Sequence, residues 1–469
     1  MTNIKFGTDG WRAVIAKDYT FKNLEIVTQA TARWIVDEEI SENGVVIGHD
    51  ARFMGREFTE HVASIFAAME IPVRMADIIA PTPAVSWGAM HYDAVGIVIT
   101  ASHNPPNYNG FKIKAPYGGP ATPDHIDAME TRYNNYNSEL EVKPYNFYLK
   151  AGLIREIPLT DQYLDVIREK IDIDGISKSG LKIGHDPMFG SGLGLIRKLL
   201  GDKQAHEIHG DFNPSFNGIA PEPIEKNLQE FAKFIPENGC QLGIANDGDA
   251  DRIGLFDETG AFVDSHKLLS LLVKYMSQNK GMSGSIIKTF STTTMLDKQA
   301  EKYGLPIETT PIGFKYIAEK IVDGDVLVGG EESGGLAVKG HIPERDGIYI
   351  GLLVAEMMVQ TGKKLSELVQ ELFDEFGPHA TWRNDLHTED RKKKAMMEHC
   401  SNKKLTELAG KKVIDWQFTD GVKHIFEDSS WLLVRPSGTE PVLRIYSEAS
   451  DQETAKKLVD EASALVNSL

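Results

Sequence analysis

Three stretches of the chain share one alternation of strand-like and helix-like segments. Each starts with a short apolar run rich in β-branched residues, passes through apolar side chains at helical spacing, and ends in a second apolar run. These stretches are residues 45–78, 181–211 and 284–314. A strand, helix, strand order builds sheets with parallel strands, so the pattern predicts three related α/β units. The repeat is weak by identity, and ordinary α/β alternation without a repeat is the alternative.

The C-terminal part of the chain follows a different order. A lysine-rich, helix-like stretch at residues 391–410 precedes strand-like runs at residues 424–438 and 441–449 and a final helix-like stretch. This order predicts a smaller α+β domain. Since 469 residues exceed what one core organises, we expect several domains. The expected domains are residues 1–150, 151–256, 257–372 and 373–469.

Composition narrows the class of partner. The formal net charge of −18 opposes binding to the phosphate backbone of a nucleic acid. The two cysteines, Cys240 and Cys400, provide neither a disulfide framework nor a cysteine-rich metal site. No apolar run approaches the roughly 20 residues of a membrane span, and the N-terminus lacks the apolar core of a signal peptide. We therefore expect a cytoplasmic protein that binds neither nucleic acid nor membrane but can still bind a small anion.

The loop after the apolar run at residues 96–100 carries several reactive groups. Ser102 and His103 precede two consecutive prolines, which hold the loop in a non-helical turn. Adjacent residues usually point apart, and the hydrolase pattern G-x-S-x-G is absent, so a Ser–His nucleophile pair is poorly supported. The serine could instead carry a phosphoryl group, with Lys112 on the next strand as a general acid or base. A decorated turn without function is the alternative.

Three carboxylates alternate in the loop within residues 242–257. Asp247, Asp249 and Asp251 lie between two apolar runs, and a hard cation such as Mg²⁺ would offset their repulsion. An EF-hand has this spacing but needs a glycine where Arg252 stands, and helices on both sides. An aspartyl-phosphate phosphatase would leave the serine loop unexplained, and a solvated acidic turn would leave the buried flanks unexplained. The loop therefore favours a Mg²⁺ site.

A glycine-rich loop lies within residues 328–348. Glu331, Glu332 and Ser333 can accept and donate hydrogen bonds to neighbouring hydroxyls, as a sugar presents them. An ordinary glycine-rich turn is the alternative.

A second polar turn lies within residues 434–444. Arg435, Ser437 and Thr439, with the amide groups around Gly438, can surround a phosphate group. An ordinary hairpin turn is the alternative.

Near the N-terminus, residues 6–12 carry the polar residues Thr8, Asp9 and Arg12, which alone are a weak signal of function.

Taken together, these motifs resemble the α-D-phosphohexomutase family, the phosphoglucomutases and phosphomannomutases. The segments that carry the resemblance are FGTDGWR (6–12), TASHNPPNYNGFKI (100–113), DGDADR (247–252), GEESGG (330–335) and RPSGTEP (435–441). They span essentially the whole chain in the family's order. The resemblance implies four domains in a heart-shaped arrangement, of which the first three are related α/β units.

The resemblance also implies roles for individual residues. The metal ligands would be Asp247, Asp249, Asp251 and a phosphate oxygen on Ser102, the phosphorylated residue. The other catalytic residues would be Arg252 at the transferring phosphoryl group, Lys112 and His103 near the proton transfers, and Arg12 at the centre. The substrate-binding residues would be Glu331 and Ser333 at the sugar hydroxyls, Lys315, and Arg435, Ser437, Gly438 and Thr439 at the non-reacting phosphate.

The implied reaction interconverts hexose 1-phosphate and hexose 6-phosphate. It would use Mg²⁺, a phosphoserine and a hexose 1,6-bisphosphate, which is both intermediate and activator. TPIGFKYI and GHIPERDGI resemble glucose-type members, while SHNPPNYNGFKI equally resembles the dual-specificity phosphomannomutases. Phosphoglucosamine mutases usually carry GEQSGH instead of GEESGG, so glucosamine phosphate is third.

Two other functional classes stay open. A phosphatase could use the same phosphoserine, and a non-catalytic sensor could bind a sugar phosphate without turnover, although the intact serine, aspartates and lysine weigh against the sensor. We expect a monomer or a homodimer.

Overall fold

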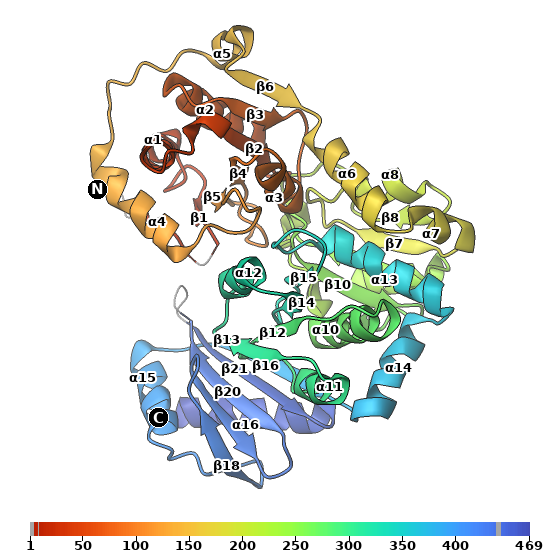
Figure 1. Ribbon diagram of the computed structural model, residues 1–469. Helices are drawn as coiled ribbons and strands as arrows, with labels where there is room; N and C mark the ends of the chain where they lie inside the picture. The colour runs from red at the N-terminus through yellow and green to blue at the C-terminus, as the bar shows by residue number, and fades with distance from the viewer. Residues whose placement is uncertain (1–3, 8, 438–441) are drawn as a thin grey trace.

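The structure is a computed structural model that describes residues 4–7, 9–437 and 442–469 (Figure 1). The described residues form four β-sheets that follow one another along the chain. Figure 1 shows the first unit at the top and the fourth at the bottom, with the second and third between them. Among the described residues, no helix combines the length and the apolar character that crossing a bilayer requires.

The first sheet has six strands in the order β1-β5-β4-β2-β3-β6. These strands are β1 (Trp11–Val14), β2 (Val45–His49), β3 (Val73–Ala76), β4 (Val95–Ile99), β5 (Tyr108–Lys114) and β6 (Ile154–Ile157). The helices of this unit are α1 (Phe21–Asp37), α2 (Gly55–Ala68), α3 (Thr82–His91), α4 (Pro123–Glu130) and α5 (Tyr145–Ala151). Val46 of β2 packs in a core with α3, and its neighbour Ile47 packs in a core with α1 and α2. Because both faces are covered, β2 and β4 are buried at every position, and apart from His49 at the end of β2 their residues are apolar.

The second and third sheets are smaller. The second has the order β11-β10-β9-β7-β8, and the third has the order β13-β12-β14-β15. The strands are β7 (Ile183–Asp186), β8 (Ala205–Glu207), β9 (Leu242–Asn246), β10 (Ile253–Asp257), β11 (Phe262–Val263), β12 (Ser285–Thr289), β13 (Ile307–Thr310), β14 (Val326–Gly330) and β15 (Leu336–Val338). The helices are α6 (Leu159–Lys170), α7 (Ile173–Ser179), α8 (Leu195–Leu200), α9 (Gln229–Glu237), α10 (Ser265–Lys274), α11 (Met295–Tyr303), α12 (Phe314–Asp323), α13 (Gly347–Thr361) and α14 (Leu365–Phe376).

One strand topology recurs in these three sheets. The recurring orders are β5-β4-β2-β3, β10-β9-β7-β8 and β15-β14-β12-β13. In each, a helix (α2, α8 or α11) lies between two parallel strands in the chain, and an antiparallel hairpin pairs on the other side of the first of those strands. This recurrence confirms the prediction of three related α/β units.

The fourth unit is the predicted α+β domain. Its sheet is antiparallel throughout, in the order β16-β21-β20-β19-β18-β17. The strands are β16 (Ala380–His387), β17 (Glu407–Leu408), β18 (Lys411–Gln417), β19 (Val422–Phe426), β20 (Trp431–Pro436) and β21 (Val442–Ala449), and the helices are α15 (Asp390–Ser401) and α16 (Gln452–Ser468).

Two sheets continue past the positions where the sequence places domain ends. Strand β6 follows residue 150 but pairs in parallel with β3 of the first sheet, and β11 follows residue 256 but pairs with β10 of the second. These strands stay with the earlier sheet because backbone hydrogen bonds at a sheet edge are satisfied by pairing. The four residue ranges given above stay a prediction.

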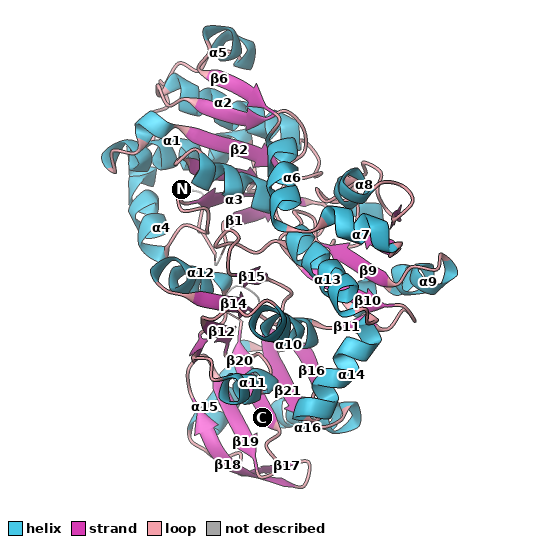
Figure 2. Cartoon of the chain, turned by 45° about the vertical axis from the view of Figure 1, so that its right-hand side comes forward, coloured by secondary structure: helices cyan, strands magenta, loops and turns pink. Residues whose placement is uncertain are grey.

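The first three units share apolar packing, while the fourth has its own core. Figure 2 shows the fourth sheet with α15 and α16 at the bottom of the molecule, and these elements have an apolar core of their own. It contacts the third unit through a small apolar cluster that contains Phe290 from the third unit and Trp431, Leu433 and Tyr446 from the fourth. Hydrogen bonds from the Thr294 amide to Glu448 Oε1 and from the Ile312 amide to Asp420 Oδ2, each 3.0 Å, also join the two units.

Lys423 is buried in this interface. Its ammonium nitrogen lies 4.5 Å from the ring centre of Phe290 and 4.2 Å from that of Trp431. Burial, and next the charge of Lys288, lowers the pKa of Lys423 to about 7. The amine is thus costly to keep charged in the folded chain.

Stability should therefore depend on pH through Lys423. The pKa of this amine is about 7 when folded and 10.5 without its neighbours, so the unfolded chain binds more protons between these values. The free energy of unfolding should rise with pH across this window, by about 1.4 kcal/mol per pH unit for one proton. In Lys423→Met this contribution should vanish, and the variant should exceed the wild type in stability near pH 7.

Thermal unfolding at several pH values between about 7.5 and 9.5 measures this difference. Lys412→Met, which replaces an exposed lysine of the neighbouring strand β18, is the control and should keep the wild-type slope. Parallel pH profiles for the wild type and Lys423→Met would show that another group is responsible.

Candidate active site

The repeated topology brings three loops together. Each is the turn of the antiparallel hairpin of its sheet, at residues 100–107, 247–252 and 331–335. Hydrogen bonds join them directly: the Ser102 hydroxyl donates to Asp247 Oδ2 at 2.8 Å, and the Ile253 amide donates to the Gly334 carbonyl at 3.2 Å. Loops from three sheets thus meet at one place, where the sequence predicts phosphoserine, metal and sugar binding.

Ser102 is fully buried and has a left-handed backbone with a φ of 52°. Its hydroxyl bonds to the Asp247 carboxylate, and His103 takes no part in that bond, as the sequence predicts. Gly248 of the aspartate loop approaches closely, since a Cβ at this position would lie 2.5 Å from the Ser102 carbonyl oxygen. A glycine between the aspartates therefore allows the serine loop to contact the metal loop.

The three aspartates form one buried cluster, with ligand oxygens within 4.8 Å of one another. Donors occupy Oδ2 of Asp249 and Asp251, whereas Oδ1 of each is buried without a hydrogen-bond partner among the described residues. Burial, and next repulsion from these two carboxylates, raises the pKa of Asp247 well above its usual range. Two orphaned oxygens beside a third carboxylate fit a divalent cation that prefers oxygen ligands.

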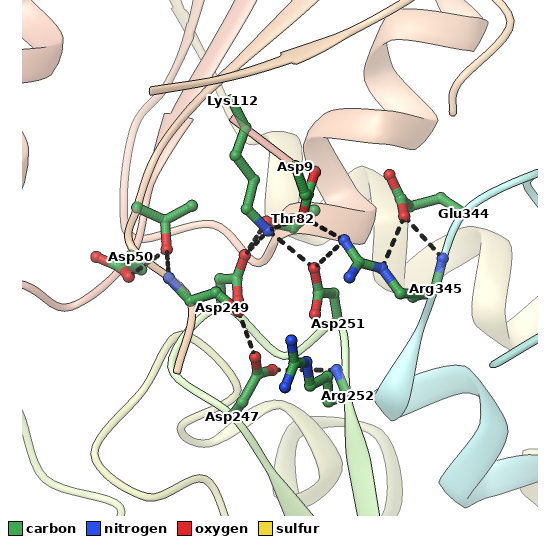
Figure 3. Close-up of polar contacts among 12 residues, drawn as sticks. Asp9, Asp50, Thr82, Lys112, Asp247, Asp249, Asp251, Arg252, Glu344 and Arg345 are labelled. Atoms are coloured by element: carbon green, nitrogen blue, oxygen red, sulfur yellow. Dashed lines mark hydrogen bonds and ion pairs between the residues drawn. The ribbon is translucent and has the colours of Figure 1, made fainter. Parts of the chain in front are cut away.

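Lys112 of β5 lies among the carboxylates (Figure 3). Its ammonium nitrogen is 2.7 Å from Asp9 Oδ2, 2.8 Å from Asp249 Oδ2 and 2.9 Å from Asp251 Oδ2. Burial alone would lower the pKa of Lys112, but the carboxylates of Asp249, Asp251 and Asp9 raise it above its usual range. The side chain is therefore a cation in this arrangement.

His103, Arg12 and Arg252 lie near this cluster. Burial, and next the guanidinium groups of Arg252 and Arg12, lower the pKa of His103 well below its usual range, so its imidazole is neutral. Arg12 donates to Asn104 Oδ1 at 3.0 Å, and the Arg252 amide donates to Asp247 Oδ1 at 3.0 Å. The structure thus brings together Ser102, Lys112, the aspartates and these three residues.

The glycine-rich loop lies beside Arg252, which forms an isolated antiparallel bridge with Gly335. Within the loop, the Ser333 hydroxyl donates to Glu331 Oε1 at 2.7 Å. Burial raises the pKa of the Glu331 carboxyl above its usual range. The Ser291 hydroxyl donates to Glu332 Oε2 at 2.5 Å. Glu331 and Ser333, the residues expected to contact sugar hydroxyls, therefore lie in a loop next to Arg252, which is expected to contact the phosphoryl group.

The remaining residues that the sequence predicts to bind substrate are Lys315, Arg435, Ser437, Gly438 and Thr439. Lys315 lines a cavity of about 140 Å³ together with Asp9. Arg435 Nε donates to Asp420 Oδ1 at 2.8 Å, and Asp420 Oδ2 accepts the Ile312 amide of the third unit at 3.0 Å. Ser437 follows β20 directly, and its amide donates to the Val442 carbonyl at 3.0 Å. Gly438 and Thr439 lie outside the described residues, as does Thr8.

The sequence analysis did not predict several charged residues at the aspartate cluster. Arg345 contacts Asp251 Oδ2 at 2.8 Å and also pairs with Asp9, while Lys114 Nζ is 2.5 Å from Glu344 Oε2. The sequence signal for them is the charged pair Glu344 and Arg345 within GHIPERDGI, a segment that also resembles glucose-type enzymes. These residues cross-link the first, second and third units at the cation site.

Comparison with known families covers most of the chain. Residues 3–140, 161–260 and 264–376 match the phosphoglucomutase/phosphomannomutase alpha/beta/alpha domains I, II and III, and residues 388–465 match the C-terminal domain of that family.

Relatives match over nearly their whole length. A phosphoglucomutase/phosphomannomutase of Thermococcus kodakarensis is 31% identical over 97% of this chain and 96% of its own. A phosphoglucosamine/phosphogalactosamine mutase of Sulfurisphaera tokodaii is 30% identical over 98% of each chain. A solved structure from Thermus thermophilus, described as a phosphomannomutase, has 34% identity and a TM-score of 0.87 and covers 100% of both chains. A Paramecium phosphoglucomutase, at 22% identity and a TM-score of 0.83, covers 99% of this chain and 96% of its own and has the same fold.

The four matched domains follow the order of the four sheets, and the Asp247 cluster lies in the second matched domain. The chain therefore belongs to the phosphoglucomutase/phosphomannomutase family, the α-D-phosphohexomutases.

Proposed function

We propose that this protein, a phosphohexomutase and hence an isomerase, interconverts hexose 1-phosphate and hexose 6-phosphate through phosphorylated Ser102 and a hexose 1,6-bisphosphate. The observation that carries the proposal is the buried Ser102 hydroxyl, 2.8 Å from one carboxylate of a triad. The other two members each have an oxygen with no hydrogen-bond partner in the part of the chain that the structure describes. A hydroxyl aligned with a cation site and without a partnered histidine suits a carrier of phosphate.

Each half of the reaction makes one P–O bond and breaks another. First the Ser102 Oγ–P bond breaks while the sugar 6-oxygen bonds to phosphorus; the 6-hydroxyl loses its proton to a base, and Ser102 Oγ takes up a proton. The neutral imidazole of His103 suits the proton acceptor, and the cationic Lys112 suits charge neutralisation. The bisphosphate then turns around and its O1–P bond breaks while Ser102 Oγ bonds to phosphorus; Ser102 Oγ loses its proton and the sugar 1-oxygen takes one up. Hexose 6-phosphate and the phosphorylated enzyme remain.

We propose Mg²⁺ as the ion, held by Asp247, Asp249, Asp251 and a phosphate oxygen on Ser102. When bound, it would neutralise charge on the transferring phosphoryl group. Hexose 1,6-bisphosphate is the proposed activator, because an enzyme that loses its intermediate keeps an unphosphorylated serine that the bisphosphate can phosphorylate again.

Glucose and mannose phosphates are the proposed preferred substrates. The Thermococcus, Sulfurisphaera and Thermus relatives, whose names cover glucose, mannose and glucosamine, have similar identities of 30% to 34%, so overall similarity does not separate the sugars. The loop GEESGG supports glucose and mannose, because Glu332 occupies the place where the glucosamine enzymes usually have glutamine. Glucose and mannose themselves differ at one hydroxyl, so a single contact can decide between them.

A side-by-side assay of glucose, mannose and glucosamine 1-phosphates, with Mg²⁺ and the matching bisphosphates, tests this function. We expect kcat/KM for glucose or mannose to exceed that for glucosamine by about tenfold or more. Fastest turnover of glucosamine 1-phosphate would make the protein a phosphoglucosamine mutase. Release of inorganic phosphate without hexose 6-phosphate would make it a phosphatase.

Arg435→Ala should weaken the hold on the non-reacting phosphate. A charge-assisted hydrogen bond contributes about 1.5 to 3 kcal/mol, so kcat/KM should fall by roughly ten- to a hundredfold. More free bisphosphate should appear per turnover, because a weaker clamp lets the intermediate escape. Steady-state kinetics and bisphosphate release measure both effects.

Arg435→Lys is the matched variant, because it keeps the positive charge but not the planar fork, and its loss should be smaller. Ser102 phosphorylation and Mg²⁺ binding should be unchanged in both variants. Wild-type kinetics without extra bisphosphate release would return this turn to an ordinary hairpin.

A further inference from the structure

One buried cation beside the site has no role in the chemistry described so far. Arg52 follows β2 and is 1% exposed. All five N–H groups of its guanidinium donate hydrogen bonds. Nε donates to Asp50 Oδ2 at 3.1 Å, Nη1 to the carbonyls of Pro105 at 2.8 Å and Tyr108 at 3.0 Å, and Nη2 to the carbonyls of Ser102 and Asn104 at 2.6 Å each. Four of the five acceptors are thus backbone carbonyls of the serine loop or its end.

Asp50, the ion-pair partner of Arg52, fixes the amide side of Ser102. The Ser102 amide donates to Thr100 Oγ1 at 2.9 Å, and the Thr100 hydroxyl donates to Asp50 Oδ2 at 2.5 Å. The ion pair of Asp50 and Arg52 therefore fixes the amide of Ser102 through Thr100 and its carbonyl directly. Both ends of the serine backbone belong to one closed ring of hydrogen bonds.

The conformation of Ser102 explains why such a ring is useful. Its φ of 52° lies in the left-handed region, which non-glycine residues keep only where their surroundings fix it. The clamp is also tied to the unit that carries the aspartates, because the Arg52 guanidinium lies 5.0 Å from the ring centre of Phe216 in the second unit. Loosening Arg52 would let the Ser102 hydroxyl drift from Asp247.

We propose that Arg52 is a positioning residue for phosphoryl transfer, which keeps the serine loop in the geometry that aligns Ser102 Oγ with the aspartate cluster. The inference rests on the proposed function, since it concerns the phosphorylated serine. A residue present for stability alone would not need to place four donors on one loop, because well-packed apolar side chains can replace a buried ion pair without loss of stability.

Arg52→Lys tests this role. Lysine keeps the charge beside Asp50 but has three N–H donors, so at least two of the five hydrogen bonds must be lost. The rate of transfer from phospho-Ser102 to hexose 1-phosphate, followed by rapid quench, should fall by about a hundredfold, the scale set by a misplacement of 1 Å. KM for hexose phosphate should change by less than about threefold, because the sugar and distal phosphate contacts lie in other units.

Tyr19→Phe is the matched control. The Tyr19 hydroxyl is buried and donates to the Gly110 carbonyl of β5 at 2.9 Å, so the change removes a buried hydrogen bond of the same sheet. All hydrogen bonds of Asp50 and Arg52 stay, and the Gly110 carbonyl keeps its second donor, the Thr100 amide at 3.1 Å. Its transfer rate should stay within about twofold of the wild type.

Phe216→Leu is the second test variant, because it removes the ring beside the guanidinium and keeps the five hydrogen-bond acceptors. Its transfer rate should fall by about two- to tenfold.

The outcomes separate positioning from stability. Wild-type transfer rates in folded Arg52→Lys, or a raised KM with an unchanged rate, would overturn the proposal. If Arg52→Lys does not fold, Phe216→Leu decides, and an unchanged rate in that variant also overturns the proposal. Failure of the proposed function gives a different result, namely a wild type without phosphate on Ser102 and an active Ser102→Ala. A phosphorylated wild type and a slow, folded Arg52→Lys support both proposals.

Discussion

Ser102→Ala is expected to lose mutase turnover by about 10⁴-fold or more in kcat, the scale seen when a covalent carrier is removed. The alanine variant has no side-chain oxygen at position 102 to accept the phosphoryl group. Among the described residues, the one other hydroxyl that donates to the aspartate cluster is that of Thr82, which bonds to Asp249. Intact-mass measurement should find a phosphate adduct on the wild type and none on the variant. Assays with added hexose 1,6-bisphosphate should not restore turnover.

Ser86→Ala is the matched control. Ser86 lies on α3 of the same unit, is fully buried, and its hydroxyl has no hydrogen-bond partner among the described residues. This variant should keep both the adduct and the activity. Since a labile adduct can be lost in handling, mass alone does not decide the matter, and full turnover by Ser102→Ala would remove Ser102 from the mechanism.

The sequence was most informative where chemistry and local pattern coincide. Asp247, Asp249 and Asp251 follow one apolar strand and precede another, so their clustering could be predicted from a single segment, and the structure confirms it. The three strand, helix, strand units were predictable for a similar reason, because alternation of buried runs is a local property. Their common topology explains why the serine, aspartate and glycine-rich loops occupy equivalent hairpins.

Long-range contacts could not be predicted in this way. Asp9 and Arg345 form an ion pair across 336 positions of sequence, and nothing near either residue indicates the other. Arg52 looks like a polar residue after a strand until its bonds to the serine loop are seen. Lys112 was predicted as an acid or base, but only the fold places three carboxylates around it. Charge networks of this kind depend on how separate units meet.

Asp247→Asn should have opposite effects on stability without and with Mg²⁺. Without the ion, burial and next the charges of Asp249 and Asp251 raise the pKa of Asp247 and make its charged form costly, while Lys112 contacts those two carboxylates and not Asp247. Removing the Asp247 charge should therefore raise the melting temperature of the ion-free protein, by an amount that corresponds to about 1 kcal/mol or more.

With Mg²⁺ the order should reverse, because binding to the folded state alone stabilises the wild type by about 2.7 kcal/mol when the ion is at a hundred times its dissociation constant. The asparagine variant loses one anionic ligand, so Mg²⁺ should raise its melting temperature much less and its turnover should fall by about a thousandfold.

Asp165→Asn, at an exposed position of α6, is the control and should behave like the wild type in both conditions. Melting curves and turnover are measured with Mg²⁺ and with excess chelator. A general loss of folding would lower both the ion-free melting temperature and the turnover of Asp247→Asn, whereas loss of a metal ligand should raise the first and lower the second. Equal stabilisation of the wild type and Asp247→Asn by Mg²⁺, or undiminished wild-type turnover in chelator, would show that the ion binds elsewhere or is not needed.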